Sequence, residues 1–173
     1  MRTPVDQIRG NASDVQKARM NDATDFWIKQ GNFAFDVATR VVITDADIVD
    51  QDDGMGRRKK TVRAIFELLV MPDMCNGSGN LHGGCSAYLA DTCTTATYML
   101  HDDWAFGHIS AALDVIYHAP APEGTNLRII CTLIALGGRI GTSRCEIWDK
   151  DKGRLVSSAS HLKMKPSAPK TKL

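Results

Sequence analysis

Four residues in the stretch NLHGGCSAYLAD (80–91) have types that could take part in chemistry. His82 is followed by Gly83 and Gly84, and a single carboxylate, Asp91, stands nine residues after the histidine. If a helix begins at the glycines, the free amides of its first turn can donate hydrogen bonds to an oxyanion. A carboxylate can accept a proton or orient a water molecule. The stretch therefore combines a candidate anion-binding group with a candidate base.

The two candidates cannot act at one point within one chain. Nine residues of α-helix span about 13 Å and place the two side chains about 180° apart around the axis, so His82 and Asp91 cannot reach the same reacting atom. If both serve one site, a second copy of the helix must supply one of them, which predicts a site at a twofold dimer interface. Two plainer interpretations stay open: His82 as a capping or packing group at a glycine-rich turn, and Asp91 as a solvated residue.

A helix over about residues 83–100 must position these groups. Its predicted core stripe consists of Cys85, Leu89, Cys93, Ala96 and Leu100. Asp91 falls nearly opposite that stripe. Its neighbours there are small or carry hydroxyl groups, and they are Gly84, Ala87, Thr94, Thr95 and Tyr98. Such a face favours close approach by another backbone or by a ligand.

Six strand-like runs surround this helix in the sequence, separated by turn-like segments. They cover about residues 36–50, 60–71, 108–118, 127–136, 140–148 and 154–165. Two strands, one helix and four strands predict an α+β fold in which the helix packs on one antiparallel sheet. One helix cannot cover six strands, so the sheet must curl around it or a second subunit must help.

The chain divides into three predicted parts. Residues 1–35 read as an extension of one or two short helices, residues 36–165 as the main domain, and residues 166–173 as a disordered basic tail. A length of 173 residues suits one hydrophobic core. No apolar run approaches the ~20 residues of a membrane span.

Charge and cysteine usage exclude several classes of function. The net charge is +1, which argues against nucleic acid or an anionic membrane as partner. Five cysteines without a CxxC pair argue against a disulfide framework and favour a cytoplasmic protein. The C-terminal Thr-Lys-Leu differs at one position from the peroxisomal targeting signal Ser-Lys-Leu. A peroxisomal location is therefore an alternative, as is a mitochondrial one. A metal site from Cys75, His82, Cys85 and Asp91 would lack a paired ligand spacing, so we expect none.

Asn76 and the HGG motif with Asp91, followed by TTATYML, a strand with Ser110 and the segment YHAPAPEG, resemble the hotdog-fold thioesterases. The similarity is to the branch of the phenylacetate-degradation and acyl-coenzyme A thioesterase thirteen-like proteins and covers about residues 61–165. It implies a hotdog fold, in which about six antiparallel strands wrap around one long central helix. It also implies hydrolysis of acyl-CoA thioesters without a cofactor, in a homodimer or a dimer of dimers.

The resemblance also implies roles for single residues. Asn76 and the Gly83 amide would hold the oxyanion, and His82 would organise the helix start. Asp91 from the partner subunit would act as general base on a water molecule that Ser110 also contacts. Asp91 as a direct nucleophile remains a minority mechanism. Gly84, Thr95 and Tyr98 would contact the substrate, and Gly137, Gly138 and Arg139 would meet the CoA phosphates.

Alternatives remain for several of these assignments. The segment at Arg139 could be only a hairpin turn with a solvated side chain, and Lys163 and Lys165 are expected to be surface charges. The substrate could be an acyl or polyketide chain on a carrier protein, or the chain could bind acyl-CoA without cleaving it. The joint presence of Asn76, Asp91 and Ser110 favours hydrolysis, because a protein that only binds needs no carboxylate beside a water site.

Overall fold

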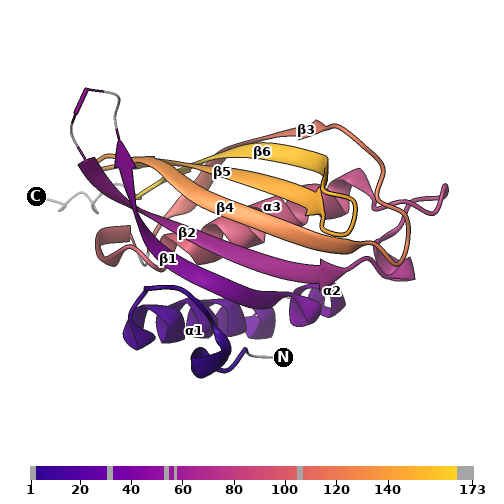
Figure 1. Ribbon diagram of the computed structural model, residues 1–173, viewed down its shortest axis with the longest axis horizontal. Coiled ribbons are helices and arrows are strands. Elements are labelled where there is room, and N and C mark those ends of the chain that lie inside the picture. Colours follow the sequence, from indigo (N-terminus) through magenta and orange to yellow (C-terminus); the bar gives the residue numbers. More distant parts are fainter. Residues whose placement is uncertain (1–2, 31–32, 53–54, 57, 105–106, 167–173) are drawn as a thin grey trace, which may run out of the picture.

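In the computed structural model, which describes residues 3–30, 33–52, 55–56, 58–104 and 107–166, one curved sheet wraps around one long helix (Figure 1). The neighbouring strands of the six-stranded sheet follow the order β1-β2-β4-β5-β6-β3, and every pair is antiparallel. The strands are β1 (Val42–Asp52), β2 (Arg58–Leu69), β3 (Ile109–Tyr117), β4 (Asn126–Leu136), β5 (Ile140–Asp149) and β6 (Arg154–Met164). The expected α+β arrangement is confirmed.

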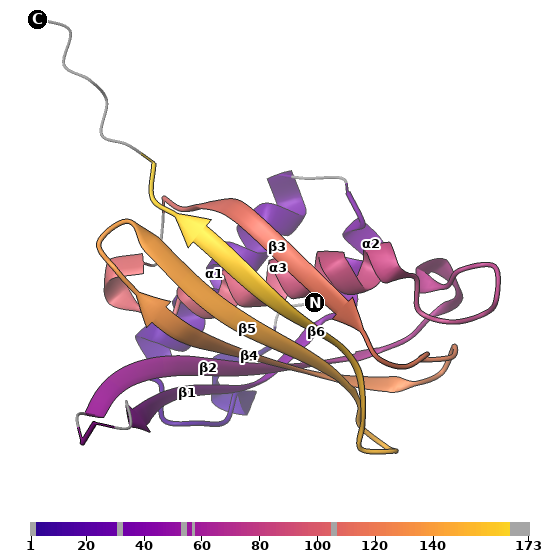
Figure 2. The ribbon, with the colours of Figure 1, turned by 90° about the horizontal axis from the view of Figure 1, so that it is seen from above.

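The central helix α3 (Gly83–Tyr98) crosses one face of this sheet (Figure 2). Leu89, Cys93 and Ala96 of the predicted stripe are buried. The opposite face is not open as a whole, because Thr94 and Tyr98 are fully buried too. A sheet that curls around a helix covers more than one stripe of it, which a helical wheel alone does not reveal.

The N-terminal segment shares the core of the sheet. It contains a 3-10 turn at Val5–Gln7, the helix α1 (Asp14–Gln30) and the helix α2 (Phe35–Arg40). Ile8 and Met20 belong to the same buried cluster as the side chains of the sheet and α3. The expectation of short helices is wrong for α1, which has 17 residues.

The first strand begins six residues later than expected. The run from residue 36 was predicted as strand, but Phe35–Arg40 is helical and β1 starts at Val42. Consecutive β-branched residues begin only at Val41, and such residues favour strands. Ala34, with a φ of 50°, forms the left-handed turn that starts α2. From residue 167 onward, the predicted tail lies outside the residues that the structure describes.

The two edges of the sheet differ. The β1 edge is covered by the N-terminal segment, since the amide of Arg9 donates to Thr44 and the carbonyl of Arg9 accepts from Ala46. The β3 edge carries the exposed apolar side chains of Ile109, Ile116 and Tyr117. Open edges can pair with another chain unless they are blocked. Among the described helices, none combines the length and the apolar character that crossing a bilayer requires.

Candidate active site

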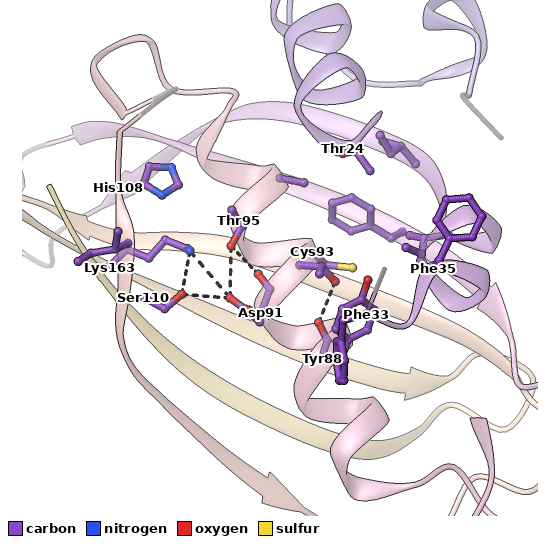
Figure 3. A pocket seen from close by; sticks show the side chains of 17 residues that line it. Thr24, Phe33, Phe35, Tyr88, Asp91, Cys93, Thr95, His108, Ser110 and Lys163 are labelled. Carbon is purple, nitrogen blue, oxygen red and sulfur yellow. Dashed lines mark hydrogen bonds and ion pairs between the residues drawn. The ribbon is translucent and has the colours of Figure 1, made fainter. Parts of the chain in front are cut away.

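Asp91 and Ser110 meet at the middle of α3. The Ser110 hydroxyl donates to Asp91 Oδ1 over 3.2 Å, and the Thr95 hydroxyl lies 3.5 Å from the same oxygen (Figure 3). Asp91 comes from the helix, and Ser110 is the second residue of β3, where the pairing with β6 shifts register between Ser110 and Ala112. A bulge of this kind redirects a side chain. The structure therefore brings two of the predicted catalytic residues together.

Two residues of β6 complete this cluster, and neither was predicted as part of it. Lys163 Nζ lies 3.1 Å from Ser110 Oγ and 3.9 Å from Asp91 Oδ1. His161 Nε2 lies 3.0 Å from Ser110 Oγ and 3.4 Å from Asp91 Oδ1. Lys163 is 3% exposed and His161 is 0% exposed. The expectation that Lys163 is a surface charge is wrong, because β6 directs it inward.

The alternation along β6 explains this placement. Ser157, Ala159, His161 and Lys163 are buried and lie two residues apart, so they share the face that packs on α3. Ser110 of β3 pairs directly with Lys163. The period-two spacing of His161 and Lys163 with Ala159 is the sequence signal that could have placed them on the inner face of the strand.

The hydrogen bonds of the cluster link the serine to the helix through the His161 ring. A serine hydroxyl has one proton and can accept two hydrogen bonds, and a lysine ammonium only donates. If Ser110 accepts from Lys163 and from His161 Nε2–H, its proton goes to Asp91. Thr94 must then donate to His161 Nδ1 instead of to the Ala90 carbonyl, which lies 2.6 Å away. In the other tautomer Nδ1–H donates to Thr94, 2.6 Å away, and Ser110 donates to His161. The tautomer of His161 thus decides whether Asp91 receives the Ser110 proton.

Burial fixes the charges of the two β6 residues. It lowers the pKa of His161 to about 4, and the nearby Lys163 cation lowers it further, so the ring is neutral at pH 7. Burial also lowers the pKa of Lys163 to about 8, against the opposing effect of Asp91. Burial and Lys163 lower the pKa of the neighbouring His108 to about 4 as well. At neutral pH the cluster therefore holds one cation, the Lys163 ammonium, beside the Asp91 carboxyl group.

A cavity of about 460 Å³ opens at this cluster. Its polar end is formed by Asp91, Thr95, His108, Ser110 and Lys163, and Figure 3 shows them on one side of the space. The remaining walls are mostly apolar and include Thr24, Phe33, Phe35, Ala38, Val41, Ile43, Phe66, Tyr88, Thr92, Cys93, Ala96 and Ile109. An apolar cavity with a few convergent polar groups is typical of a small-molecule site.

The other predicted catalytic residues lie at the start of α3. His82 is the N-cap, and its Nδ1 accepts from the Gly84 amide over 2.9 Å. Its backbone oxygen accepts from Cys85 and Ser86, so these contacts engage the first-turn amides other than that of Gly83. The side-chain oxygen of Asn76 accepts from the amides of two neighbouring loop residues, Ser78 and Asn80. This leaves the Asn76 amide nitrogen as the end that can donate to a ligand.

Tyr117, at the other end of β3 from Ser110, contacts the start of α3. Its hydroxyl donates to the Gly83 carbonyl over 2.9 Å, and a Cβ on Gly83 would lie 3.2 Å from the tyrosine ring. This close approach of the tyrosine ring explains why residue 83 is a glycine. Neither Asn76, His82 nor Gly83 lines the cavity among the described residues. Within one chain, the structure does not bring these residues to Asp91.

The remaining predicted substrate contacts fall into three places. Thr95 lines the cavity, whereas Gly84 is exposed at the start of α3. Tyr98 does not reach the cavity, because its ring is fully buried against Trp104 and His108. A large aromatic ring at the covered end of α3 gains more from core packing than from exposure.

Gly137, Gly138 and Arg139 form the exposed turn between β4 and β5. The Gly137 amide donates to Ile140, and the Arg139 carbonyl accepts from Lys165, just beyond β6. Gly141, two residues after Arg139, pairs with Lys163. The turn therefore lies at the same end of the sheet as the Asp91 cluster.

The four residues considered as metal ligands, Cys75, His82, Cys85 and Asp91, do not form a metal-binding group among the described residues. In the described parts of the chain, no group of three or more histidine, cysteine or acidic residues could hold a metal ion. Asp91 is about 13 Å along α3 from His82. All five cysteines are free thiols.

Comparisons with known proteins agree with the motif. The thioesterase superfamily model matches residues 78–156. Acyl-coenzyme A thioesterase 13 of Homo sapiens is 27% identical over 101 residues, which is 58% of this chain and 71% of the relative. The Mus musculus protein of the same name is 28% identical over the same shares of the two chains. The resemblance drawn from the motif is confirmed, and these matches point to a thioester hydrolase.

Solved structures show the same fold. Zebra fish thioesterase superfamily member 2 aligns with a TM-score of 0.67 at 19% identity, over 85% of this chain and 98% of that one. Thioesterase superfamily member 2 from Mus musculus aligns with a TM-score of 0.63 at 22% identity, over 84% and 96%. The chain therefore has the hotdog fold.

Proposed function

We propose that this chain hydrolyses acyl-CoA thioesters to the free acid and CoA. It has the hotdog fold, and its family match and relatives point to a thioester hydrolase. The observation that carries the proposal is the contact between Ser110 Oγ and Asp91 Oδ1 at the polar end of an otherwise apolar cavity. A hydrolase of this kind needs a proton acceptor beside a water molecule and an apolar space for the acyl group.

The reaction divides into two steps. Asp91 accepts a proton from a water molecule while the water oxygen bonds to the thioester carbon, and the carbonyl oxygen becomes an oxyanion. The carbon–sulfur bond then breaks, and the CoA sulfur leaves with a proton returned from Asp91. When Ser110 donates to His161 Nε2, its oxygen keeps one acceptor position, which can hold the water molecule beside Asp91 Oδ1. Lys163 holds the Ser110 oxygen and places positive charge beside the carboxylate.

The oxyanion donors would come from a second subunit. Ser110 stands near one end of β3 beside Asp91, and Tyr117 stands at the other end, bonded to Gly83. If the open β3 edges of two chains pair antiparallel, the Ser110 end of one chain lies beside the Tyr117 end of the other. The Gly83 amide and the nearby Asn76 side chain of the partner would then approach the Asp91 cluster. Donors directed at the oxyanion are worth several kcal/mol in such reactions.

The exposed β3 edge supports this arrangement. Ile109, Ile116 and Tyr117 are each more than half exposed in the single chain. Apolar groups on an open strand edge gain from being covered by a second copy, and twofold symmetry makes the contact self-complementary. A homodimer, or a dimer of dimers, is therefore part of the proposal.

The turn at Arg139 is proposed to bind the CoA phosphates together with Gly137 and Gly138. It lies at the cluster end of the sheet, and Arg139 is an exposed residue whose planar guanidinium group matches phosphate geometry. A carrier-bound acyl chain is the second candidate substrate, since its acyl group would need the same cavity and it has no nucleotide phosphates for Arg139 to contact. A cytoplasmic location, with a peroxisomal or mitochondrial one as alternative, rests on the sequence alone.

Thiol release from a panel of acyl-CoA thioesters tests the proposal. We expect the wild type to release CoA and the Asp91→Asn variant to be slower by 10²- to 10⁴-fold, the range typical of a lost general base. Asp103→Asn, which changes an exposed carboxylate on a short turn, should keep wild-type activity. No release from any thioester would overturn the proposal and would favour an acyl-CoA-binding protein.

A further inference from the structure

Two aromatic side chains of the N-terminal segment are exposed where the cavity opens. Phe33 is 80% exposed and Phe35 is 46% exposed, yet both line the cavity. The Phe33 ring contacts Tyr88 edge-on, with 5.5 Å between the ring centroids. Figure 3 shows both rings on the side away from the polar cluster. Large apolar side chains that stay exposed beside a cavity mark a surface that a ligand covers.

Phe33 and Phe35, called the aromatic wall below, line the same cavity as the polar cluster at Asp91. Tyr88 precedes Asp91 by three residues on α3, so the two lie on neighbouring positions of the same helix face. Phe66 of β2 and Val41, just before β1, line the space as well. A group attached to a carbonyl at Asp91 can therefore extend along apolar walls until it meets Phe33 and Phe35.

The wall is fixed to the rest of the molecule. Phe35 begins α2, and Arg40 at the end of α2 forms an ion pair with Asp73, with 2.7 Å between Nη2 and Oδ2. Asp73 lies in the 3-10 turn Pro72–Met74, whose Met74 carbonyl accepts from the His82 amide. Val37 and Ala38 of α2 are buried. Phe35 therefore stands on an anchored helix.

We propose that the segment from Phe33 to Val41 is the outer wall of the acyl pocket and sets the length of acyl chain that the protein accepts. The inference rests on the proposed function and adds its substrate class: thioesters whose apolar acyl group ends within the cavity, against Phe33 and Phe35. Acyl chains that end before the wall lose apolar contact. Acyl chains that are longer meet the aromatic rings and gain nothing further.

Chain-length dependence of binding measures this directly. Each methylene that leaves water on binding improves affinity by about fourfold. Calorimetry with S-alkyl-CoA thioethers from two to sixteen carbons, which cannot be hydrolysed, should show this slope up to a limiting length and a plateau beyond it. In the Phe33→Ala/Phe35→Ala variant the limit should move to longer chains by two or more carbons. Thioethers too short to reach the wall should bind as they do to the wild type.

Two further variants keep the test decisive. Val15→Ala changes an exposed apolar residue of α1 that does not line the cavity, and it should leave the limiting length unchanged. Phe33→Leu/Phe35→Leu keeps apolar bulk and serves if the alanine variant does not fold. It should move the limit in the same direction, because leucine is smaller than phenylalanine.

The outcomes separate this inference from the proposed function. If hydrolysis occurs but the limiting length is the same in the wild type and in both wall variants, the wall assignment is overturned while the activity stands. If thioethers bind with a limit that moves in the wall variants but no thioester is cleaved, the wall stands and the proposed activity fails. Binding without any dependence on chain length would overturn the acyl pocket itself.

Discussion

The ammonium group of Lys163 lies 3.1 Å from the hydroxyl oxygen of Ser110, across two strands that pair at these two residues. The sheet register itself therefore delivers a buried cation to the serine that contacts Asp91. Burying an ammonium group costs free energy unless it contacts an acceptor or a negative charge. Lys163 has both, in Ser110 and Asp91. Catalytic activity should therefore depend on the charge of Lys163.

Loss of the Lys163 charge should lower activity at high pH. Because the pKa of Lys163 is lowered to about 8, we expect kcat/KM of the wild type to fall as the pH rises through about 8. Lys163→Gln removes the cation at every pH, so it should lack this alkaline limb and be slower by about tenfold to a hundredfold, the value of a charge-assisted hydrogen bond. Lys165→Gln, two residues away, should keep the limb. An unchanged limb in Lys163→Gln would contradict the role of this residue.

Acid should destabilise the protein through His161. Its folded-state pKa is lowered from 6.5 to about 4, so the unfolded chain takes up a proton first and stability is lost as the pH falls from 6.5 to 4. Between pH 7 and 5 this group alone should reduce the free energy of unfolding by about 2 kcal/mol. Urea unfolding of His161→Asn should show a smaller acid loss than the wild type. His118→Asn, an exposed change, should keep the wild-type loss, and equal losses in all three proteins would refute the assignment.

The cap at His82 should support both stability and catalysis. His82→Ala removes the acceptor for the Gly84 amide and should cost about 1 kcal/mol of stability, as other N-cap losses do. His82→Asn can still cap and should recover most of that loss in thermal unfolding. If His82 only organises the helix start, the Asn variant should also recover most of the kcat that the Ala variant loses. A kcat that stays low in the Asn variant would instead assign the imidazole a direct chemical role.

Arg139 should distinguish CoA from a carrier-bound substrate. Arg139→Ala removes a proposed phosphate contact, so the KM for an acyl-CoA should rise by about fivefold to tenfold, with kcat little changed. The KM for the matching acyl-pantetheine, which lacks the nucleotide phosphates, should stay the same. Lys152→Ala in the turn between β5 and β6 is the matched control. An unchanged KM for both substrates would favour the solvated-turn interpretation, and an equal rise for both would contradict a contact with the nucleotide phosphates.

Much of the fold followed from local patterns. Alternation and turn residues predicted β4, β5 and β6 to within about one residue, because each strand is bounded by glycine, proline or charged turn segments. The start of β1 was missed because Phe35–Arg40 has no strong local preference, and as a helix it buries Val37 and Ala38. Side-chain packing of this kind is a tertiary property, which short-range patterns do not contain.

The candidate site was predictable only in part. Asp91 and Ser110 were singled out and do meet, but His161 and Lys163 were not, since a lysine in a terminal strand is usually exposed. Their inward position depends on the pairing of β6 with β3 and on the bulge at Ser110. The cavity wall at Phe33 depends on where the N-terminal segment packs, which no spacing in the sequence encodes.

In the proposed dimer, Asp91 of one subunit works with Asn76 and Gly83 of the other. The most direct test is a purified mixed dimer, with Asp91→Asn on one tagged chain and Asn76→Ala on a differently tagged chain. The two parent homodimers should each be nearly inactive. The mixed dimer contains one intact composite site, so its kcat per dimer should recover to about half of the wild-type value. A mixed dimer as inactive as its parents would contradict the composite site and require all catalytic groups to come from one chain.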